Sequence, residues 1–336
     1  MSARASILPV FVPHLGCPHA CVFCDQRRIS GAERPATAED VKNRIAERAA
    51  FLPVGGKRQL AFYGGSFTAI PAKEQEALLG AAKEALDRGE IDSIRLSTRP
   101  DAIDERVLAR LKRYGAETVE LGAQSMDDAV LRLTERGHTA ADVTRAARAV
   151  KAAGFRLILQ MMTGLPGSTD ERDVETAKKI IELKPDGVRV YPTVIVRGTK
   201  LFDMWQAGIY PEHTVEDAVR VCAKLLPLFE AAGIPVIRLG LNPTEELSNG
   251  TAVAGAYHPA LGELVKSRIL LEKARALLRG FEPGSRVCIT VGKGKASQMA
   301  GQHRENTRRL TEEFSLGELK IREKSDPDAE LEALRL

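Results

Sequence analysis

The sequence has little cysteine, little charge imbalance and no long apolar run. Its five cysteines are an odd number, and three of them fall within residues 17–24, which argues against a disulfide-stabilised secreted scaffold. A net charge of +4 is too small on its own to indicate a nucleic-acid-binding protein. No apolar stretch approaches the ~18 residues that cross a bilayer. The first residues lead into a cysteine motif without a small-residue cleavage site, so we expect no signal peptide.

What is present is typical of a folded globular protein, with 44% hydrophobic and 28% charged residues. Short runs of β-branched residues alternate with longer stretches of helical periodicity. The expected strands are residues 7–12, 59–63, 93–97, 118–122, 156–161, 187–192 and 235–239. The expected helices are residues 37–51, 71–88, 104–114, 139–153, 169–183 and 215–232.

This alternation predicts βαβ units and a parallel sheet, and six or seven units favour a full or partial (β/α) barrel. The alternation of expected strands and helices stops after Leu239. We expect three parts: a barrel over residues 1–240, a connecting loop and helix that complete the barrel mouth over 241–280, and a small basic α+β module over 281–336. In that module we expect strands at 286–291 and 318–322, a helix at 297–314, and a frayed acidic tail from Ser325.

Three cysteines follow the first expected strand in the segment Cys17-Pro18-His19-Ala20-Cys21-Val22-Phe23-Cys24. Thiolates three and four residues apart on a tight loop can all reach one soft metal centre. A tetrahedral structural zinc site needs four ligands, whereas a [4Fe–4S] cluster held by three cysteines keeps one iron open. The alternatives are a zinc site completed by His14 or His19 and three unligated thiols. Cys222 and Cys288 stand alone and are expected to be buried small hydrophobes.

The C-x3-C-x2-C spacing after the first strand of a βα array, with Phe23 before the last cysteine, resembles the signature of the radical S-adenosylmethionine (SAM) superfamily. Further segments resemble, in order, the radical SAM half of the Elongator catalytic subunit. They are residues 62–68, 97–101, 119–125, 136–139, and 191–193 with 197–199. The acetyltransferase domain of that subunit is missing and the cysteine spacing is more compact. We therefore expect a stand-alone, bacterial-type relative to which the Elongator reaction does not carry over.

The resemblance implies a partial (β/α)6-type radical SAM barrel with a [4Fe–4S] cluster and SAM as cofactors. It makes Cys17, Cys21 and Cys24 the metal ligands. It also implies an enzyme in which one electron from the reduced cluster cleaves SAM, giving a 5′-deoxyadenosyl radical that abstracts hydrogen from the substrate. The cofactors carry this chemistry, while the protein binds them and excludes side reactions.

Two of the resembling segments end neighbouring strands and are expected to bind SAM. Gly64, Gly65 and Ser66 follow the second strand, where the family holds the methionine ammonium. Glycine lets backbone carbonyls approach a ligand closely. Ser97 and Thr98 end the third strand, where family members bind the SAM ribose or carboxylate.

Later strands supply further candidates. Gln124 follows the fourth strand, and Arg136 stands twelve positions later, the offset of a carboxylate-binding arginine in related enzymes; the alternative is a solvated surface arginine. Gln160 is a polar residue in an otherwise apolar strand, where its amide needs a partner, either a SAM hydroxyl or a group within the barrel. Tyr191 ends the sixth strand and is the candidate catalytic residue, with adenine stacking or ordinary packing as alternatives.

The segment 297–306 resembles a degenerate KH-domain segment, in which a GxxG loop between two helices clamps nucleic-acid backbone. Here the loop has arginine in place of the second glycine. Residues 286–309 contain six basic residues against one acidic residue, which favours contact with phosphates; the alternative is a solvated surface of the module. The expected RNA-binding residues are Lys293, Lys295, Gly301, Arg304 and Arg308.

These features predict a cytoplasmic radical SAM enzyme that modifies a base of tRNA or rRNA and is reduced by a partner such as flavodoxin or ferredoxin. We expect the loop over residues 240–262 to approach the barrel mouth. Two other hypotheses remain. One is a radical SAM enzyme with a small-molecule substrate such as a porphyrinogen-like compound, because coproporphyrinogen-oxidase-like members share the compact cysteine spacing. The other is a non-catalytic RNA-binding protein with a structural metal.

Overall fold

The computed structural model describes residues 6–12, 17, 21–25, 34–49, 56–241 and 252–336. The chain divides into two units. The first comprises residues 1–214 and 225–257, and the second comprises residues 215–224 and 258–336. Within the described residues, no helix combines the length and the apolar character that crossing a membrane requires.

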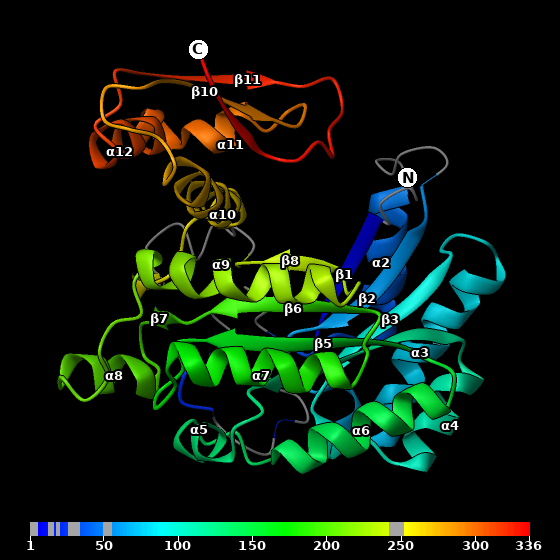
Figure 1. Cartoon of the computed structure of the whole chain (residues 1–336). Helices are drawn as coiled ribbons and strands as arrows, with labels where there is room; N and C mark the ends of the chain where they lie inside the picture. The colour runs from blue at the N-terminus through cyan, green and yellow to red at the C-terminus, as the bar shows by residue number, and fades with distance from the viewer. Residues whose placement is uncertain (1–5, 13–16, 18–20, 26–33, 50–55, 242–251) are drawn as a thin grey trace. The chain divides into compact units, whose positions relative to one another are not determined.

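Seven parallel strands form the main sheet of the first unit, in the order β1-β2-β3-β4-β5-β6-β8 (Figure 1). Their bounds are β1 Ser6–Phe11, β2 Arg58–Tyr63, β3 Ser93–Thr98, β4 Ala116–Gln124, β5 Arg156–Thr163, β6 Gly187–Pro192 and β8 Val236–Leu239. β1 and β8 are the two edges, so the sheet is an open half-barrel. This confirms the predicted α/β partial barrel, in which all seven expected strands are present.

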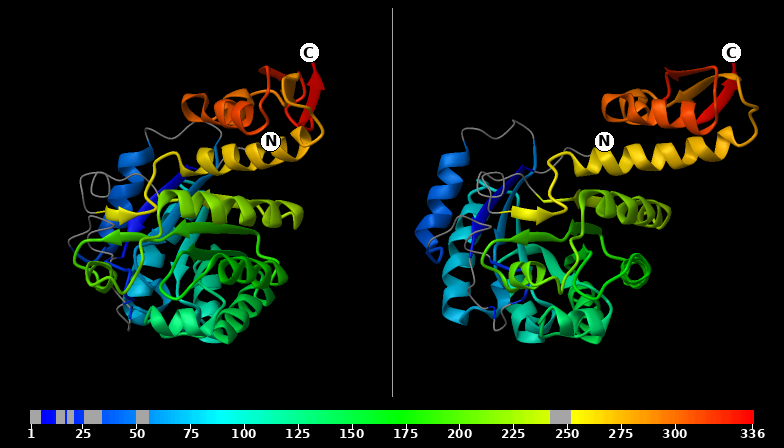
Figure 2. Two further views of the ribbon diagram at one scale, coloured as in Figure 1. Left: turned by 60° about the vertical axis from the view of Figure 1, so that its left-hand side comes forward. Right: turned by 90° about the vertical axis from the view of Figure 1, so that its left-hand side faces the viewer.

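Helices cover the outer face of this sheet (Figure 2). Side chains on that face, such as Leu60, Leu96, Leu121 and Leu159, are fully buried, because alternate residues of a strand point to opposite faces. The helices of the first unit include α2 Ala38–Ala49, α3 Ala72–Asp87, α4 Glu105–Arg113, α5 Asp128–Leu133, α6 Ala140–Ala152, α7 Asp170–Glu182 and α8 Lys200–Gln206. Helix α9 (Val215–Ala231) contributes residues to both units.

Several short elements were not foreseen in the sequence. Helices α5 and α8, and the antiparallel pair of β7 (Val194–Val196) and β9 (Ala252–Gly255), are too short to show a periodic pattern. Two single 3-10 turns, η1 (Phe67–Ala69) and η2 (Pro100–Ala102), follow β2 and β3. They turn the chain at the carboxyl ends of these strands, where the expected SAM-binding segments lie.

The second unit has a three-stranded sheet in the order β11-β10-β12. Its elements are α10 Leu261–Leu278, β10 Arg286–Val291, α11 Ala296–Ala300, η4 Gln302–Arg304, α12 Glu305–Glu313, β11 Glu318–Glu323 and β12 Glu332–Arg335. Its core joins side chains from the helices and the strands, including Leu278, Ile289, Met299 and Leu310. The expectation of a frayed tail from Ser325 is wrong, because β12 pairs antiparallel with β10 and satisfies its backbone groups there.

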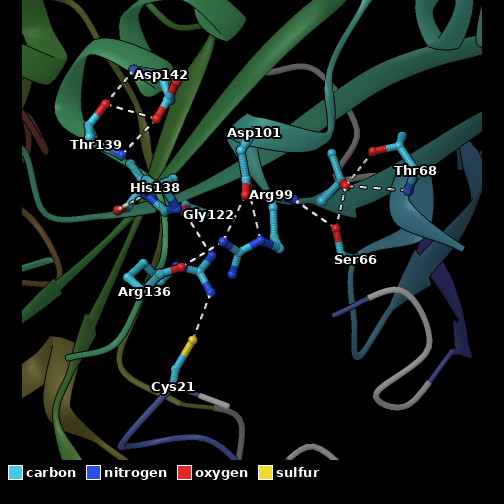
Figure 3. A network of polar contacts seen from close by, with 12 residues as sticks. Cys21, Ser66, Thr68, Arg99, Asp101, Gly122, Arg136, His138, Thr139 and Asp142 are labelled. Carbon is cyan, nitrogen blue, oxygen red and sulfur yellow. Dashed lines mark hydrogen bonds and ion pairs between the residues drawn. The ribbon is translucent and has the colours of Figure 1, made fainter. Parts of the chain in front are cut away.

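The loop that precedes α6 is fixed by polar contacts (Figure 3). Thr139 and Asp142 form a capping box at the start of the helix. The Nε2 atom of His138 lies 3.2 Å from the carbonyl oxygen of Ala123 on β4. Burial, followed by the nearby Arg136 cation, lowers the pKa of His138 from 6.5 to about 4. His138 is therefore neutral near pH 7, and its Nε2–H donates to that carbonyl.

We expect this buried histidine to make stability depend on pH. Between pH 6.5 and 4 the unfolded chain binds a proton at His138 that the folded chain does not, so the free energy of unfolding falls as the pH is lowered. The full loss is about 3 kcal/mol, from roughly 1.4 kcal/mol per pKa unit. Urea denaturation of the wild type and of His138→Gln at pH 7, 5.5 and 4.5 measures this. The wild type should lose stability relative to the variant; equal losses would contradict the assignment.

Candidate functional site

Hydroxyl groups join the ends of β2 and β3. The Oγ of Ser66 lies 2.9 Å from the Oγ1 of Thr98, and the Oγ1 of Thr68 lies 2.6 Å from the same atom. The backbone N–H of Arg99 donates to Ser66 Oγ at 3.2 Å. Ser66 and Thr98 are buried. Two segments predicted separately as SAM-binding therefore form one hydrogen-bonded edge.

Gly64 begins the turn that leads into this edge. Its φ of +91° lies in the region that residues with a side chain rarely adopt. A Cβ added there would lie 3.2 Å from the ring of Phe11 on β1. The glycine thus lets the backbone after β2 turn tightly beside β1, with Gly65 following it in the same turn.

Arg136 links the cysteine loop to the end of β4 (Figure 3). Its Nη1 donates to the Sγ of Cys21 at 3.3 Å, and its Nη2 donates to the carbonyl of Gly122 at 2.9 Å. A Cβ at position 122 would lie 2.8 Å from Arg136 Nη2 and 2.9 Å from Gln124 Nε2. Arg136 is buried, so the alternative of a solvated surface arginine is wrong.

Arg99 holds the backbone of Arg136 in place. The Nη2 of Arg99 donates to the backbone carbonyl of Arg136 at 2.6 Å. Arg99 also makes a bidentate pair with Asp101, with both distances 2.9 Å. Arg99 is 2% exposed. A planar guanidinium held at two sides fixes the backbone that carries Arg136.

The three predicted metal ligands lie in the described part of the cysteine loop. Cys21 is buried, while Cys17 and Cys24 are half-buried. Burial raises the pKa of the Cys17 thiol, and the cations of Arg136 and Arg99 oppose that rise. Among the described residues, no three His, Cys, Asp or Glu side chains form a ready-made ligand set. His14 and His19, the alternative zinc ligands, lie outside the described residues, as does the loop segment 242–251.

Among the described residues, the buried polar atoms of this network that make no hydrogen bond include Oε1 of Gln124, Nε of Arg136 and Nη1 of Arg99. Gln124 has a φ of 61° and stands at a register shift between β4 and β5. Backbone strain and unpaired buried polar groups are typical of ligand sites. These unpaired atoms fit the amino and carboxylate groups of SAM, and thiolate sulfur fits the iron of a cluster.

Gln160 faces the interior of the half-barrel. Its Nε2 donates to Oε2 of Glu120 at 2.8 Å and lies 3.4 Å from Oγ of Ser97. The structure therefore brings Ser97 and Gln160 together around Glu120. The hydroxyl of Tyr191 accepts a hydrogen bond from Nη1 of Arg189 at 3.4 Å. Burial raises the pKa of Tyr191, so it is a neutral phenol near pH 7.

Sequence reasoning missed two charged residues of this interior, Arg95 and Arg189. Both contact Glu120, at 2.6 Å and 3.0 Å. Each stands between two buried apolar residues of its strand, Arg95 between Ile94 and Leu96 and Arg189 between Val188 and Val190. This alternation with period two was the available signal, because it marks a strand with one polar and one apolar face.

The predicted RNA-binding loop lies in the second unit, between α11 and α12. The helix expected over residues 297–314 is broken there, because Gly301, His303 and Arg304 have φ values of 75°, 49° and 60°. A cavity of about 350 Å³ adjoins the break and is lined by His303, Arg304, Thr307, Arg308, Thr311 and Glu312. Arg304, Arg308 and Lys293 are exposed and Lys295 is half-buried. The broken helix thus presents basic side chains at a hollow surface.

Relatives among known proteins cover part of the chain. The tRNA uridine(34) acetyltransferase of Methanocaldococcus jannaschii is 28% identical over 61% of this chain and 45% of its own length. Human Elongator complex protein 3 is 31% identical over 61% of this chain and 40% of its own length. The chain thus spans less than half the length of these relatives.

Solved structures share the fold. The Elp3 structure of Methanocaldococcus infernus superposes with a TM-score of 0.64 at 23% identity, covering 82% of this chain and 64% of the other. Coproporphyrinogen III oxidase of Escherichia coli, described as a radical SAM enzyme, superposes with a TM-score of 0.50 at 20% identity, covering 69% and 54%.

Two family profiles match successive parts of the chain. The radical SAM superfamily profile matches residues 11–180, about half of the chain and the part that holds the cysteine loop, Gly64, Gln124 and Arg136. The profile of the radical SAM C-terminal domain matches residues 185–270. The chain is a member of the radical SAM superfamily and a distant relative of Elongator complex protein 3.

Proposed function

We propose that Cys17, Cys21 and Cys24 hold a [4Fe–4S] cluster, that SAM binds at the adjoining strand ends, and that the enzyme modifies RNA. The observation that carries the cofactor assignment is Arg136, whose guanidinium reaches both Cys21 Sγ and the carbonyl of Gly122. A guanidinium fork suits a carboxylate. Arg136 would therefore hold the SAM carboxylate next to the sulfur ligands.

The remaining proposed SAM ligands come from the carboxyl ends of neighbouring strands. The Gly64–Ser66 turn would receive the methionine ammonium, and Gln124 would use its unpaired Oε1. Ser97, Thr98 and Gln160 would contact the nucleoside. When bound, cluster and SAM supply one-electron cleavage of the sulfonium and a carbon radical that abstracts hydrogen. The residues of this chain would position the cofactors.

RNA is the proposed substrate for two reasons. The curated relatives include proteins named for tRNA uridine(34), and the second unit exposes Lys293 before α11, Arg304 between α11 and α12, and Arg308 on α12. The proposed contacts are Lys293, Lys295, Gly301, Arg304 and Arg308, with tRNA favoured over rRNA. The chemistry also needs a one-electron donor, for which we propose a flavodoxin- or ferredoxin-like protein. Tyr191 is the proposed residue nearest the reacting groups.

We expect Cys21→Ala to abolish cluster binding, because a cluster with two sulfur ligands is not retained. Anaerobic reconstitution followed by iron and sulfide analysis measures this, and product analysis should detect no 5′-deoxyadenosine. Cys288→Ala, which removes a buried cysteine of the second unit, is the matched control and should keep wild-type iron. Wild-type protein that takes up zinc in place of iron would support the structural-metal hypothesis and contradict this one.

We expect Lys293→Ala with Arg304→Ala to weaken tRNA binding. Each lost phosphate contact should also reduce the slope of log K against log salt by about one. Filter binding at several salt concentrations measures both. Lys320→Ala with Arg322→Ala removes the same charge from β11 and is the control. Equal effects of the two double variants would show that only net charge matters. Absence of salt-sensitive binding in the wild type would favour a small-molecule substrate.

A further inference from the structure

The inner face of the half-barrel carries a group of polar side chains, called here the interior cluster. They come from the adjacent strands β2 to β6 and are Tyr63, Arg95, Glu120, Gln160 and Arg189. The strand register places these side chains on one face, with Gln160 beside Arg189 and Ser97 beside Glu120. The proposed SAM ligands explain Gln160 but not the other four members.

Glu120 is the centre of the interior cluster. Its Oε1 accepts hydrogen bonds from Arg95 Nη1 at 2.6 Å, Arg189 Nη2 at 3.0 Å and the Tyr63 hydroxyl at 3.2 Å. Its Oε2 accepts from Gln160 Nε2 at 2.8 Å. The Glu120 side chain is 0% exposed. One carboxylate thus holds two guanidinium groups in fixed positions.

The charges of the interior cluster do not balance. Among the described residues, two guanidinium groups, Arg95 and Arg189, face a single carboxylate, and their side chains are only 12% and 9% exposed. Burial raises the pKa of Tyr63 and of Tyr191, so neither phenol adds a negative charge near neutral pH. A buried excess of positive charge is unfavourable unless a further anion pairs with it.

In the described part of the chain, some buried polar atoms in and beside the interior cluster also make no hydrogen bond. The Nε atoms of Arg95 and Arg189 are buried without a partner. The Oγ1 of Thr118, whose backbone pairs in register with Arg95, lacks a partner as well. Arginine presents its donors as a planar fork that matches phosphate and carboxylate. Three unpaired polar atoms in one region of the sheet therefore leave hydrogen-bonding capacity that suits an oxyanion.

Solvent reaches this face from the carboxyl end of the strands. Ser97, Gln160, Met162 and Tyr191, which point inward there, are half-buried. Their outward-pointing neighbours, such as Leu96, are fully buried under the helices. The inner face is thus open at the end of the sheet where SAM is proposed to bind.

We propose that the interior cluster is a binding subsite for an oxyanion of the substrate, with Arg95 and Arg189 as its ligands and Glu120 as the group that positions them. This inference rests on the proposed function, because it places the substrate inside the half-barrel beside SAM. A phosphate of RNA and a carboxylate of a small molecule share this chemistry. The proposed function favours the phosphate.

The test is equilibrium binding, so it does not depend on turnover. Titration calorimetry of the reconstituted protein with SAM, at low salt, compares inorganic phosphate, uridine 5′-monophosphate, uridine and succinate. Uridine 5′-monophosphate should bind more tightly than uridine. Arg189→Gln and Arg95→Gln should each weaken its binding about tenfold or more, since each loses a charge-assisted hydrogen bond. Arg156→Gln, at the exposed start of β5, is the matched control and should bind like the wild type.

The Glu120→Gln variant best distinguishes an oxyanion-binding subsite from an ion-pair network that only stabilises the fold. The amide oxygen can still accept from the two arginines and hold them in position, but the neutral side chain no longer offsets their charge, so binding should tighten about threefold or more. Phosphate should also raise the melting temperature of this variant more than that of the wild type. This measurement of the melting temperature keeps the proposal testable if the loss of the Glu120 charge lowers the stability of the variant.

Each result of these titrations either supports the proposed subsite or overturns it. Binding of uridine 5′-monophosphate that depends on both arginines supports the subsite and its nucleotide source, and binding of inorganic phosphate with the same dependence supports the subsite alone. Binding of succinate alone, with the same dependence, supports the subsite but contradicts RNA as substrate. The proposal is overturned if no anion binds, if both arginine variants bind like the wild type, or if Glu120→Gln weakens binding and gains no stability from phosphate.

Discussion

The contact between the Arg136 guanidinium and the sulfur of Cys21 joins two parts of the chain that are 115 residues apart. The same guanidinium donates to Gly122, and Arg99 holds the Arg136 backbone from the other side. Ser66 and Thr98, at the ends of β2 and β3, are therefore connected to the cysteine loop through hydrogen bonds that run by way of Arg99 and Arg136. Such a network is costly to leave partly unpaired, and the unpaired atoms of Gln124 and Arg136 are where a ligand would complete it.

The half-barrel separates two chemical environments by strand alternation. Outward-facing side chains such as Leu60 and Leu121 are buried under helices and supply the stability of the first unit. The inward face carries most of the polar side chains of the sheet, including the pair of Arg95 and Arg189 around Glu120. The apolar face can thus hold the sheet together while the other face remains available for ligands.

Sequence patterns predicted the long elements well, because helices and strands of normal length show clear periodicity. They could not predict β12, whose residues Glu332–Arg335 gain their strand structure only by pairing with β10. Helical periodicity also did not show the break at His303 and Arg304, since two residues with positive φ are set by tertiary packing and not by their own preference. Only the resemblance to a KH segment indicated a loop there.

The sequence predicts those residues of the candidate site that belong to recognisable motifs. Cys21, Ser66, Gln124 and Arg136 follow from their places after successive strands, and the superfamily match covers that region. The identity of their partners was not predictable. Gln160 was expected to need a partner, but only the three-dimensional structure pairs it with Glu120.

The central claim is that three cysteines leave one iron of a cluster open next to Arg136. Electron paramagnetic resonance of the reduced, reconstituted protein with and without SAM tests it most directly. The account predicts a [4Fe–4S] signal that changes when SAM is added and that no longer responds to SAM in Arg136→Gln. A signal that SAM leaves unchanged in the wild type, typical of a fully ligated cluster, would contradict it.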